Sequence, residues 1–210
     1  MKSDTGHDFS IKDVEILDNE TCFDGFLSIS RIRLRHRLYA GGWSQAFSRE
    51  LMCRRPGVGV LLYDPVLDKV VLVQQFRVGC LDDEQNGPWA IELVAGIVDA
   101  DESPEDVAIR EAQEEAKLGI RTLIPVCQYY NSPGGSNEKL WIFCAGVDAD
   151  KAGGIHGLAD ENEDIQTLVM SRTEAEAAVA AGRINNAMSI IAIQWLGLNL
   201  ERVKRMLTRA

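Results

Sequence analysis

The segment 96–115 constrains this chain more than any other, because it holds a glycine loop, a helix start and a row of carboxylates in one stretch. Ser103 is a good N-cap, Pro104 suits the first helical position, and Asp106 completes a capping-box-like pattern. Together they predict a helix over 104–117. At about 100° per residue, its alanines fall on one arc and its glutamates on the neighbouring arc. The small alanines predict a helix that lies close on a sheet.

The glutamates of this helix indicate a metal site. Glu111 and Glu115 are spaced i, i+4, and like charges at this spacing destabilise a helix by about 0.2–0.5 kcal/mol. A divalent cation would reverse the sign of that contribution. Hard oxygen ligands suit Mg²⁺ or Mn²⁺, which take further ligands from water and substrate phosphate. An acidic helix face is more often merely solvated, but the ordered spacing favours a metal-dependent diphosphate site.

The same spacing resembles the Nudix box, the pattern G-x5-E-x7-R-E-U-x-E-E-x-G-U of the Nudix hydrolase family. Six positions match in register: Gly96, Glu102, Arg110, Glu111, Glu114 and Glu115. The chain departs from the pattern at Lys117, where the family carries glycine. Because glycine there helps to end the helix, we expect Gly119 to end it instead.

Composition and charge exclude several classes of protein. A net charge of −10 counts against nucleic acid as a partner, because binding to a phosphate backbone needs clustered Lys and Arg. The chain lacks an apolar run of about 18 residues and an apolar N-terminal signal segment, so we expect a cytoplasmic protein without a membrane span. Its five cysteines are odd in number and lack metal-ligand spacing, so we expect mostly reduced core thiols.

The order of predicted elements indicates an α/β (α+β) fold, with a mixed β-sheet sandwiched between α-helices. Residues 26–39 alternate in places, which predicts an antiparallel strand in a β-rich N-terminal segment, 1–55. The remainder, 56–210, is the predicted hydrolase domain. Its predicted strands are 58–63 and 70–76, joined as a hairpin, then 89–94, 123–130, 140–147 and 165–170; two helices follow at 173–181 and 187–207.

A second acidic cluster lies far downstream, in the glycine-bearing loop 154–164. Four acids in five residues usually mark a solvated loop, but this loop resembles the catalytic loop of the bacterial ADP-ribose pyrophosphatase branch of the Nudix family. That resemblance implies that Glu161 is the general base and that Glu163 reaches a metal ion. His156 would also serve as a base on chemistry alone, although a loop histidine is more often structural.

Further positions resemble the same branch. It carries a proline about fifteen residues beyond the box, and Pro133 stands there, although Pro-Gly-Gly also suits an ordinary turn. The resemblance implies a homodimer in which the N-terminal segment exchanges between subunits. It also implies that Phe26 stacks on adenine. The other substrate-binding positions that it implies are Arg49, Arg77, Ser132, Pro133 and Glu138.

The activity implied by the resemblance is Mg²⁺-dependent hydrolysis of ADP-ribose to AMP and ribose 5-phosphate. Two or three Mg²⁺ or Mn²⁺ ions would be held by Glu111, Glu115, Glu163 and the carbonyl of Ala95. Glu114 would share a metal ion, and Arg110 would orient the glutamates. Glu102 would brace the loop.

Two alternatives stay open. Another nucleoside diphosphate sugar, such as GDP-mannose, would satisfy the box equally well, because the box recognises only the diphosphate and the metal. A catalytically silent, nucleotide-sensing Nudix domain is the second alternative, with Lys117 as a first sign of decay. The complete acidic set argues against it.

Overall fold

The computed structural model describes residues 9–158 and 162–208, and the chain divides into two compact units. Unit 1 contains residues 9–54 together with the loop 130–138, and unit 2 contains the rest. The sequence division near residue 55 did not include that loop in the N-terminal part.

Unit 1 is a three-stranded antiparallel sheet of β1 (Val14–Asp24), β2 (Ser28–His36) and β3 (Phe47–Cys53). The strand predicted within 26–39 is confirmed as β2. Its arginines meet acidic partners on the neighbouring strands, as in the pairs of Arg35 with Glu15 and of Arg31 with Glu20. Among the described residues of this unit only Ser30 and Ser136 are buried, so the sheet contains no buried apolar side chain.

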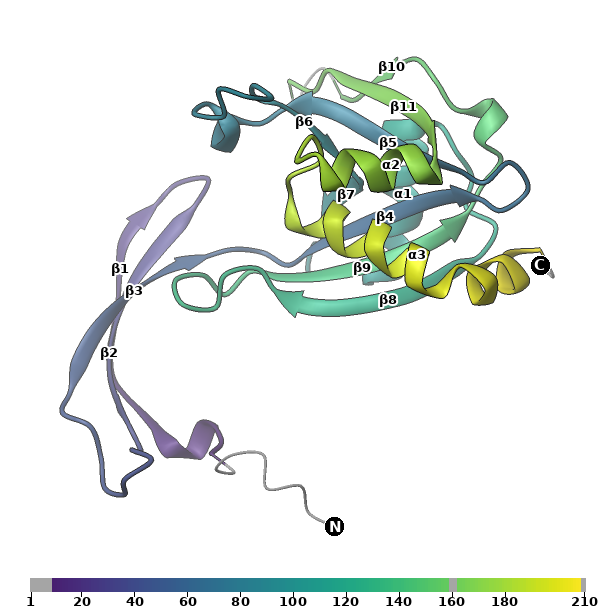
Figure 1. Cartoon of the computed structure of the whole chain (residues 1–210). Helices are drawn as coiled ribbons and strands as arrows, with labels where there is room; N and C mark the ends of the chain where they lie inside the picture. Colours follow the sequence, from purple (N-terminus) through teal and green to yellow (C-terminus); the bar gives the residue numbers. More distant parts are fainter. Residues whose placement is uncertain (1–8, 159–161, 209–210) are drawn as a thin grey trace, which may run out of the picture. The chain divides into compact units, whose positions relative to one another are not determined.

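Unit 2 is built on an eight-stranded sheet in the order β10-β11-β5-β4-β9-β8, with β6 beside β5 and β7 beside β4 (Figure 1). β4 pairs with β9 in parallel and with β5 and β7 antiparallel, so the predicted mixed sheet is confirmed. The strands are β4 (Gly57–Asp64), β5 (Lys69–Phe76), β6 (Trp89–Glu92), β7 (Val94–Ile97), β8 (Leu123–Tyr130), β9 (Lys139–Gly146), β10 (Ile155–His156) and β11 (Ile165–Ser171).

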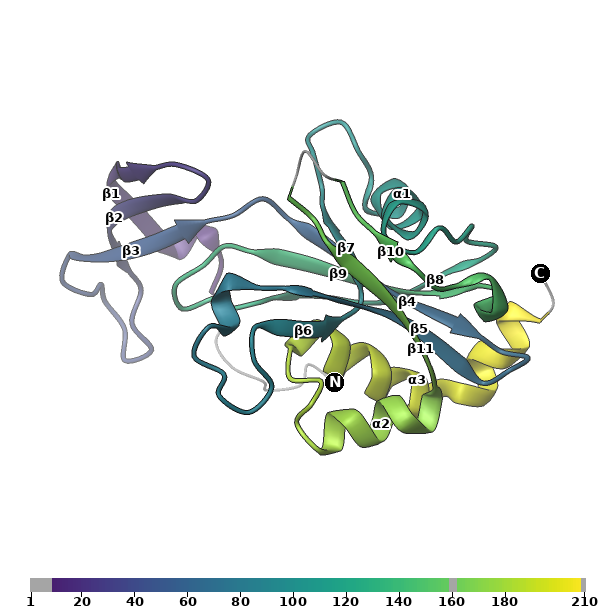
Figure 2. The ribbon, with the colours of Figure 1, turned by 90° about the horizontal axis from the view of Figure 1, so that it is seen from above.

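Helices cover both faces of this sheet. Figure 2 shows α1 (Pro104–Ala116) on one face and α2 (Arg172–Ala180) and α3 (Ala187–Leu207) on the other. Alternate residues of β5 point to opposite helical layers: Val71 and Val73 pack with α1, whereas Val70 and Leu72 pack with α2 and α3. The alanines of α1 are fully buried against the sheet, as the sequence predicts: Ala108, Ala112 and Ala116.

The end of α1 differs from the prediction. The helix stops at Ala116, and Lys117 itself takes the left-handed conformation, with φ 54° and ψ 30°. Its N–H caps the carbonyl of Ala112. The expectation that Gly119 ends the helix was therefore wrong, because Lys117 performs the role of the family's glycine. A non-glycine residue in that conformation costs about 1–2 kcal/mol.

Two further predictions were wrong, and a third can be assessed only for the described residues. The predicted strand 89–94 is two strands, because the chain leaves β5 at Glu92 and joins β4 at Val94. All five cysteines are free, but only Cys144 is buried, so the expectation of mostly core thiols was wrong. Among the described residues, no helix has both the length and the apolar character needed to cross a bilayer.

Candidate active site

The start of α1 is tied to the loop before it. The side-chain oxygen of Ser103 accepts the backbone N–H of Asp106 at 3.1 Å, as the sequence predicts. One helical turn later, Arg110 reaches back to Glu102 and donates to its two carboxylate oxygens at 3.0 and 3.3 Å. This bidentate pair fixes the loop against the helix.

The guanidinium of Arg110 also contacts two glutamates on its own helix. Its Nη1 donates to Glu111 at 2.9 Å and to Glu114 at 3.0 Å. The hydrogen bonds that Arg110 donates to Glu102, together with the charges of Glu111 and Glu114, raise the pKa of Arg110 above its ordinary value. One arginine therefore offsets the mutual repulsion of three carboxylates.

Gly96 allows the carboxylate of Glu111 to lie directly against strand β7. A Cβ atom at residue 96 would fall 1.8 Å from Oε1 of Glu111 and 2.5 Å from its Cγ. Any side chain at this position would therefore occupy the space that the glutamate now fills. The motif therefore needs glycine at residue 96 because the glutamate fifteen residues later packs directly against it.

Glu111 and Glu115 are acids one turn apart on α1, the first half-buried and the second buried. The Glu115 residue is 3% exposed, and its Oε2 accepts the backbone N–H of Ala95 at 3.1 Å. Burial raises the pKa of Glu111 to about 7 and that of Glu115 to about 8, although Arg110 and the Ala95 N–H act in the opposite direction. Two largely desolvated carboxylates one helical turn apart favour a cation between or beside them.

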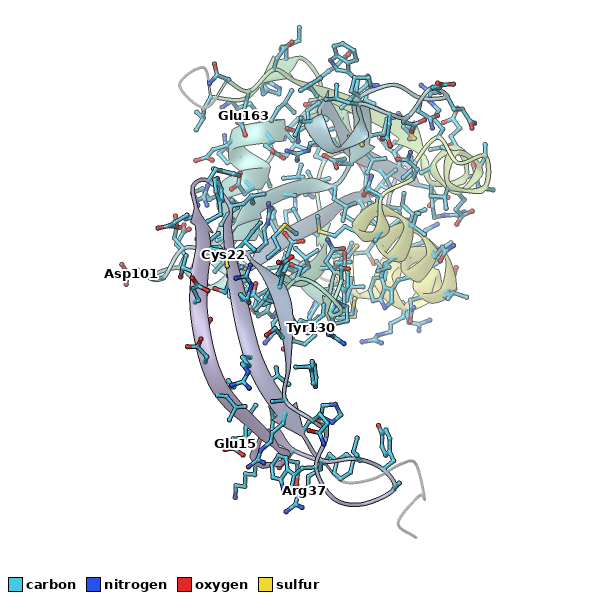
Figure 3. The ribbon with its side chains drawn as sticks, turned by 90° about the vertical axis from the view of Figure 1, so that its left-hand side faces the viewer. Glu15, Cys22, Arg37, Asp101, Tyr130 and Glu163 are labelled. Carbon is cyan, nitrogen blue, oxygen red and sulfur yellow. The ribbon has the colours of Figure 1, made fainter. Side chains whose placement is uncertain are left out.

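The downstream acidic loop approaches the same helix. Glu163, labelled in Figure 3, is close enough to α1 for its charge to raise the pKa of both Glu111 and Glu115. Its own Oε2 accepts the N–H of Leu158 at 3.1 Å. Gly157 has φ +102°, and a Cβ there would lie 2.7 Å from the Cβ of Glu163, so glycine permits this tight loop. Glu161, the predicted base, lies outside the described residues.

His156 is engaged elsewhere in the loop. Its Nε2 lies 2.8 Å from the carbonyl oxygen of Gly153, within the turn that leads to β10. This contact agrees with the structural interpretation of the histidine.

The acidic groups of unit 2 fit a hard divalent cation such as Mg²⁺. The donors are oxygens, from the half-buried Glu111 and the buried Glu115 on α1, with Glu163 nearby. Within residues 9–158 and 162–208, no group of three or more acidic, histidine or cysteine side chains is placed so that it could hold a metal ion. Mg²⁺ usually keeps several waters and takes further ligands from substrate phosphate, so one or two protein carboxylates are enough to hold it. The assignment of Ala95, Glu111, Glu115 and Glu163 as ligands stays a prediction.

Comparison with known families agrees with this geometry. The NUDIX domain matches residues 54–188, a range that includes α1, the glycine loop and the downstream acidic loop. The chain belongs to the Nudix family.

Two of the relatives match almost the whole chain, and a third matches 71% of it. The ADP-ribose pyrophosphatase of Escherichia coli (strain K12) is 46% identical over 93% of this chain and 93% of its own length. The ADP-ribose pyrophosphatase of Haemophilus influenzae is 41% identical, over 94% and 92% respectively. A GDP-mannose pyrophosphatase of Cronobacter sakazakii is 36% identical, over 71% and 78%.

A solved structure supports the fold. The crystal structure of an ADP compounds hydrolase superposes with a TM-score of 0.71 at 19% identity, and the match covers 93% of this chain and 98% of that one. The Nudix fold predicted from the sequence, a mixed sheet between helices, is therefore confirmed.

The predicted substrate residues are divided between the two units. Arg77 lies in unit 2, whereas Phe26, Arg49, Ser132, Pro133 and Glu138 lie in unit 1. The Phe26 residue is 89% exposed, and the Arg49 guanidinium stacks 4.6 Å from the ring centroid of Phe47.

The loop that carries three of these substrate residues is held by hydrogen bonds within unit 1. The Ser132 carbonyl accepts the N–H of Gly135 and of Ser136, which closes the turn around Pro133. The Glu138 carboxylate accepts from Arg54 at 3.0 Å and from Asn131 at 2.7 Å.

Sequence reasoning about the Nudix box missed Glu92. Its Oε2 accepts from Nε of Arg77 at 2.7 Å, and the Arg77 charge partly opposes the rise in the pKa of Glu115 that burial causes, which places this ion pair near the box carboxylates. The sequence gives little indication of the Arg77–Glu92 pair, because Glu92 ends a short apolar strand and the loop 77–88 separates that strand from β5. Only the pairing of β5 with β6 brings the two together.

Proposed function

We propose that this chain is a divalent-metal-dependent hydrolase that cleaves the diphosphate of ADP-ribose to AMP and ribose 5-phosphate. The observation that carries the proposal is the pair of largely desolvated carboxylates, the half-buried Glu111 and the buried Glu115, lying one turn apart against the glycine loop. Such a pair is costly to bury unless a cation accompanies it. The substrate is inferred from the ADP-ribose pyrophosphatases that match nearly the full chain.

In this proposal, Glu111, Glu115, Glu163 and the carbonyl of Ala95 would hold two or three Mg²⁺ or Mn²⁺ ions, and Glu114 would share one of them. When bound, they neutralise the charge of the diphosphate. Glu161 takes a proton from the attacking water, whose oxygen forms a new bond to one phosphorus. The bond from that phosphorus to the bridging oxygen breaks, and the bridging oxygen leaves with the other phosphate. Arg110 keeps the glutamates in place through its three contacts.

Unit 1 supports a second part of the proposal, a homodimer formed through segment 1–55, with residues 56–210 as the hydrolase domain. A three-stranded sheet needs an apolar face covered by another element for stability. Unit 1 leaves large apolar residues uncovered, among them Phe23 at 57% exposure and Ile16 at 60%. A second copy of the sheet, exchanged or packed, would cover them. In this arrangement Phe26 stacks on the adenine, and Arg49, Arg77, Ser132, Pro133 and Glu138 bind the remaining substrate groups. The cytoplasmic location stays a prediction.

A panel of nucleoside diphosphate derivatives with Mg²⁺, assayed for nucleoside monophosphate release, tests the substrate. We expect ADP-ribose to give the highest kcat/KM, and a higher value for GDP-mannose would favour that alternative. If every compound resists hydrolysis while ADP-ribose still binds, the chain is the nucleotide-sensing alternative.

The Glu161→Gln variant in the same assay tests the base. We expect kcat to fall by about 10²–10⁴-fold with little change in substrate affinity, because that is the typical contribution of a general base. An unchanged kcat would remove Glu161 from this role.

A further inference from the structure

Gln75 carries a buried amide that the fold does not use. The residue is 5% exposed, and its Nε2 has no hydrogen-bond partner within residues 9–158 and 162–208. Buried side-chain donors are paired in the large majority of cases, since an unpaired donor loses its water without compensation. Its neighbour Gln74 shows the ordinary arrangement, because Nε2 of Gln74 donates to the carbonyl of Trp89 at 3.2 Å.

The register of β5 places Gln75 on the face that carries α1. Val71 and Val73 pack in the core beneath α1, and side chains of a strand alternate, so Gln75 continues this row. Arg77 follows two residues later in extended conformation, with φ −130° and ψ 114°. Gln75 therefore lies between the buried Val73 and the Arg77–Glu92 ion pair, on the same face as the carboxylates of α1.

On β6, the residues on the same face as Gln75 are either small or already paired. The residue directly opposite on β6 is Ala90, whose side chain is a single methyl group. The next residue of β6 on this face, Glu92, is engaged with Arg77 at 2.7 Å. The strand pairing is complete without the amide. A buried polar group that the fold does not need is most simply explained by a ligand.

We propose that Gln75 is a substrate-binding residue, whose amide donates a hydrogen bond to a non-bridging oxygen of the substrate diphosphate beside Arg77. This inference rests on the proposed function. An anionic phosphate oxygen is the acceptor that best complements an N–H donor next to a guanidinium. The amide adds a donor without adding charge near the carboxylates.

Gln75→Leu, with Gln74→Leu as the matched control on the opposite face, tests the inference. In Gln75→Leu we expect KM for ADP-ribose to rise about 10–100-fold while kcat changes little, because one hydrogen bond to a charged group is lost in ground and transition states alike. The midpoint of thermal unfolding should not fall, since the free protein loses no hydrogen bond. Gln74→Leu should keep the wild-type KM.

Two inhibitors show whether the diphosphate is the group that Gln75 binds. The inhibition constant of ADP should rise in Gln75→Leu by the same factor as KM, while that of adenosine should stay unchanged. A wild-type KM in Gln75→Leu, or an equal loss for adenosine and ADP, would overturn the inference. If Gln75→Leu does not fold, Gln75→Met keeps the bulk and removes the donor. A wild-type protein inert toward ADP-ribose would instead refute the proposed function.

Discussion

Replacing Gly96 by alanine should disable the site by displacing Glu111. The new Cβ would lie 1.8 Å from Oε1, 2.3 Å from Cδ and 2.5 Å from Cγ of Glu111. Since non-bonded heavy atoms settle at about 3.5–4.0 Å, the glutamate must move by roughly 1–2 Å. It has little freedom to do so, because Arg110 donates to it at 2.9 Å and its side chain is 13% exposed.

A displacement of this size at a reacting site typically costs about 10²-fold in rate. We therefore expect kcat/KM of Gly96→Ala for ADP-ribose to fall about 100-fold, and the Mg²⁺ concentration for half-maximal activity to rise. Initial rates of AMP release across a Mg²⁺ series measure both quantities. Gly119→Ala is the matched control, because its Cβ would meet no atom within 4 Å. A Gly96→Ala variant with wild-type rates and Mg²⁺ dependence would refute the argument that the glycine makes room for a metal-binding carboxylate.

Three further predictions concern stability. Asp64→Asn should lower the free energy of unfolding by about 1–3 kcal/mol in urea titrations, because the Asp64 carboxylate accepts the N–H groups of Val66, Leu67 and Ala149. Burial alone would raise the pKa of Asp64, but these hydrogen bonds hold it below its ordinary value. The carboxylate therefore stabilises the fold above about pH 4, and this stabilisation is lost in stronger acid. When both proteins are titrated with acid, the variant should lose less free energy of unfolding than the wild type. Mg²⁺ should raise the unfolding midpoint more at pH 8.5 than at pH 6. Burial raises the pKa values of Glu111 and Glu115 to about 7 and about 8, so both carboxyls become ionised as the pH rises through these values. Their ionisation destabilises the metal-free fold, and bound Mg²⁺ offsets that loss. Equal shifts at both pH values would contradict this linkage. Lys117→Gly should stabilise the protein by about 1 kcal/mol without changing Mg²⁺ dependence, since glycine adopts the left-handed conformation without strain; a lower unfolding midpoint would count against it.

The elements that the sequence predicted well are those set by local chemistry. Ser103 and Pro104 determine where α1 begins, and the alanine spacing determines which side of it packs on the sheet. The hairpin of β4 and β5 follows from two apolar runs joined by a turn. In each case the information lies within a few residues of the element itself.

The features that the sequence did not reveal depend on contacts between distant residues. The switch of partner between Glu92 and Val94 is set by two different neighbouring strands, and periodicity within 89–94 cannot distinguish them. The Arg77–Glu92 pair and the unpaired amide of Gln75 likewise emerge only when β5 and β6 lie together. At Lys117 the fold requires the left-handed backbone conformation, although lysine disfavours it.

Hydrolysis of ADP-ribose by the wild type, Glu115→Gln and Glu105→Gln across a Mg²⁺ series tests the central claim most directly. Glu105 is an exposed glutamate on the same helix, whereas Glu115 is buried against Ala95. We predict AMP release that requires Mg²⁺ in the wild type and in Glu105→Gln, and that is lost or shifted to much higher Mg²⁺ in Glu115→Gln. Equal activity and equal Mg²⁺ dependence in all three proteins would contradict a metal-dependent diphosphate site at the buried glutamates.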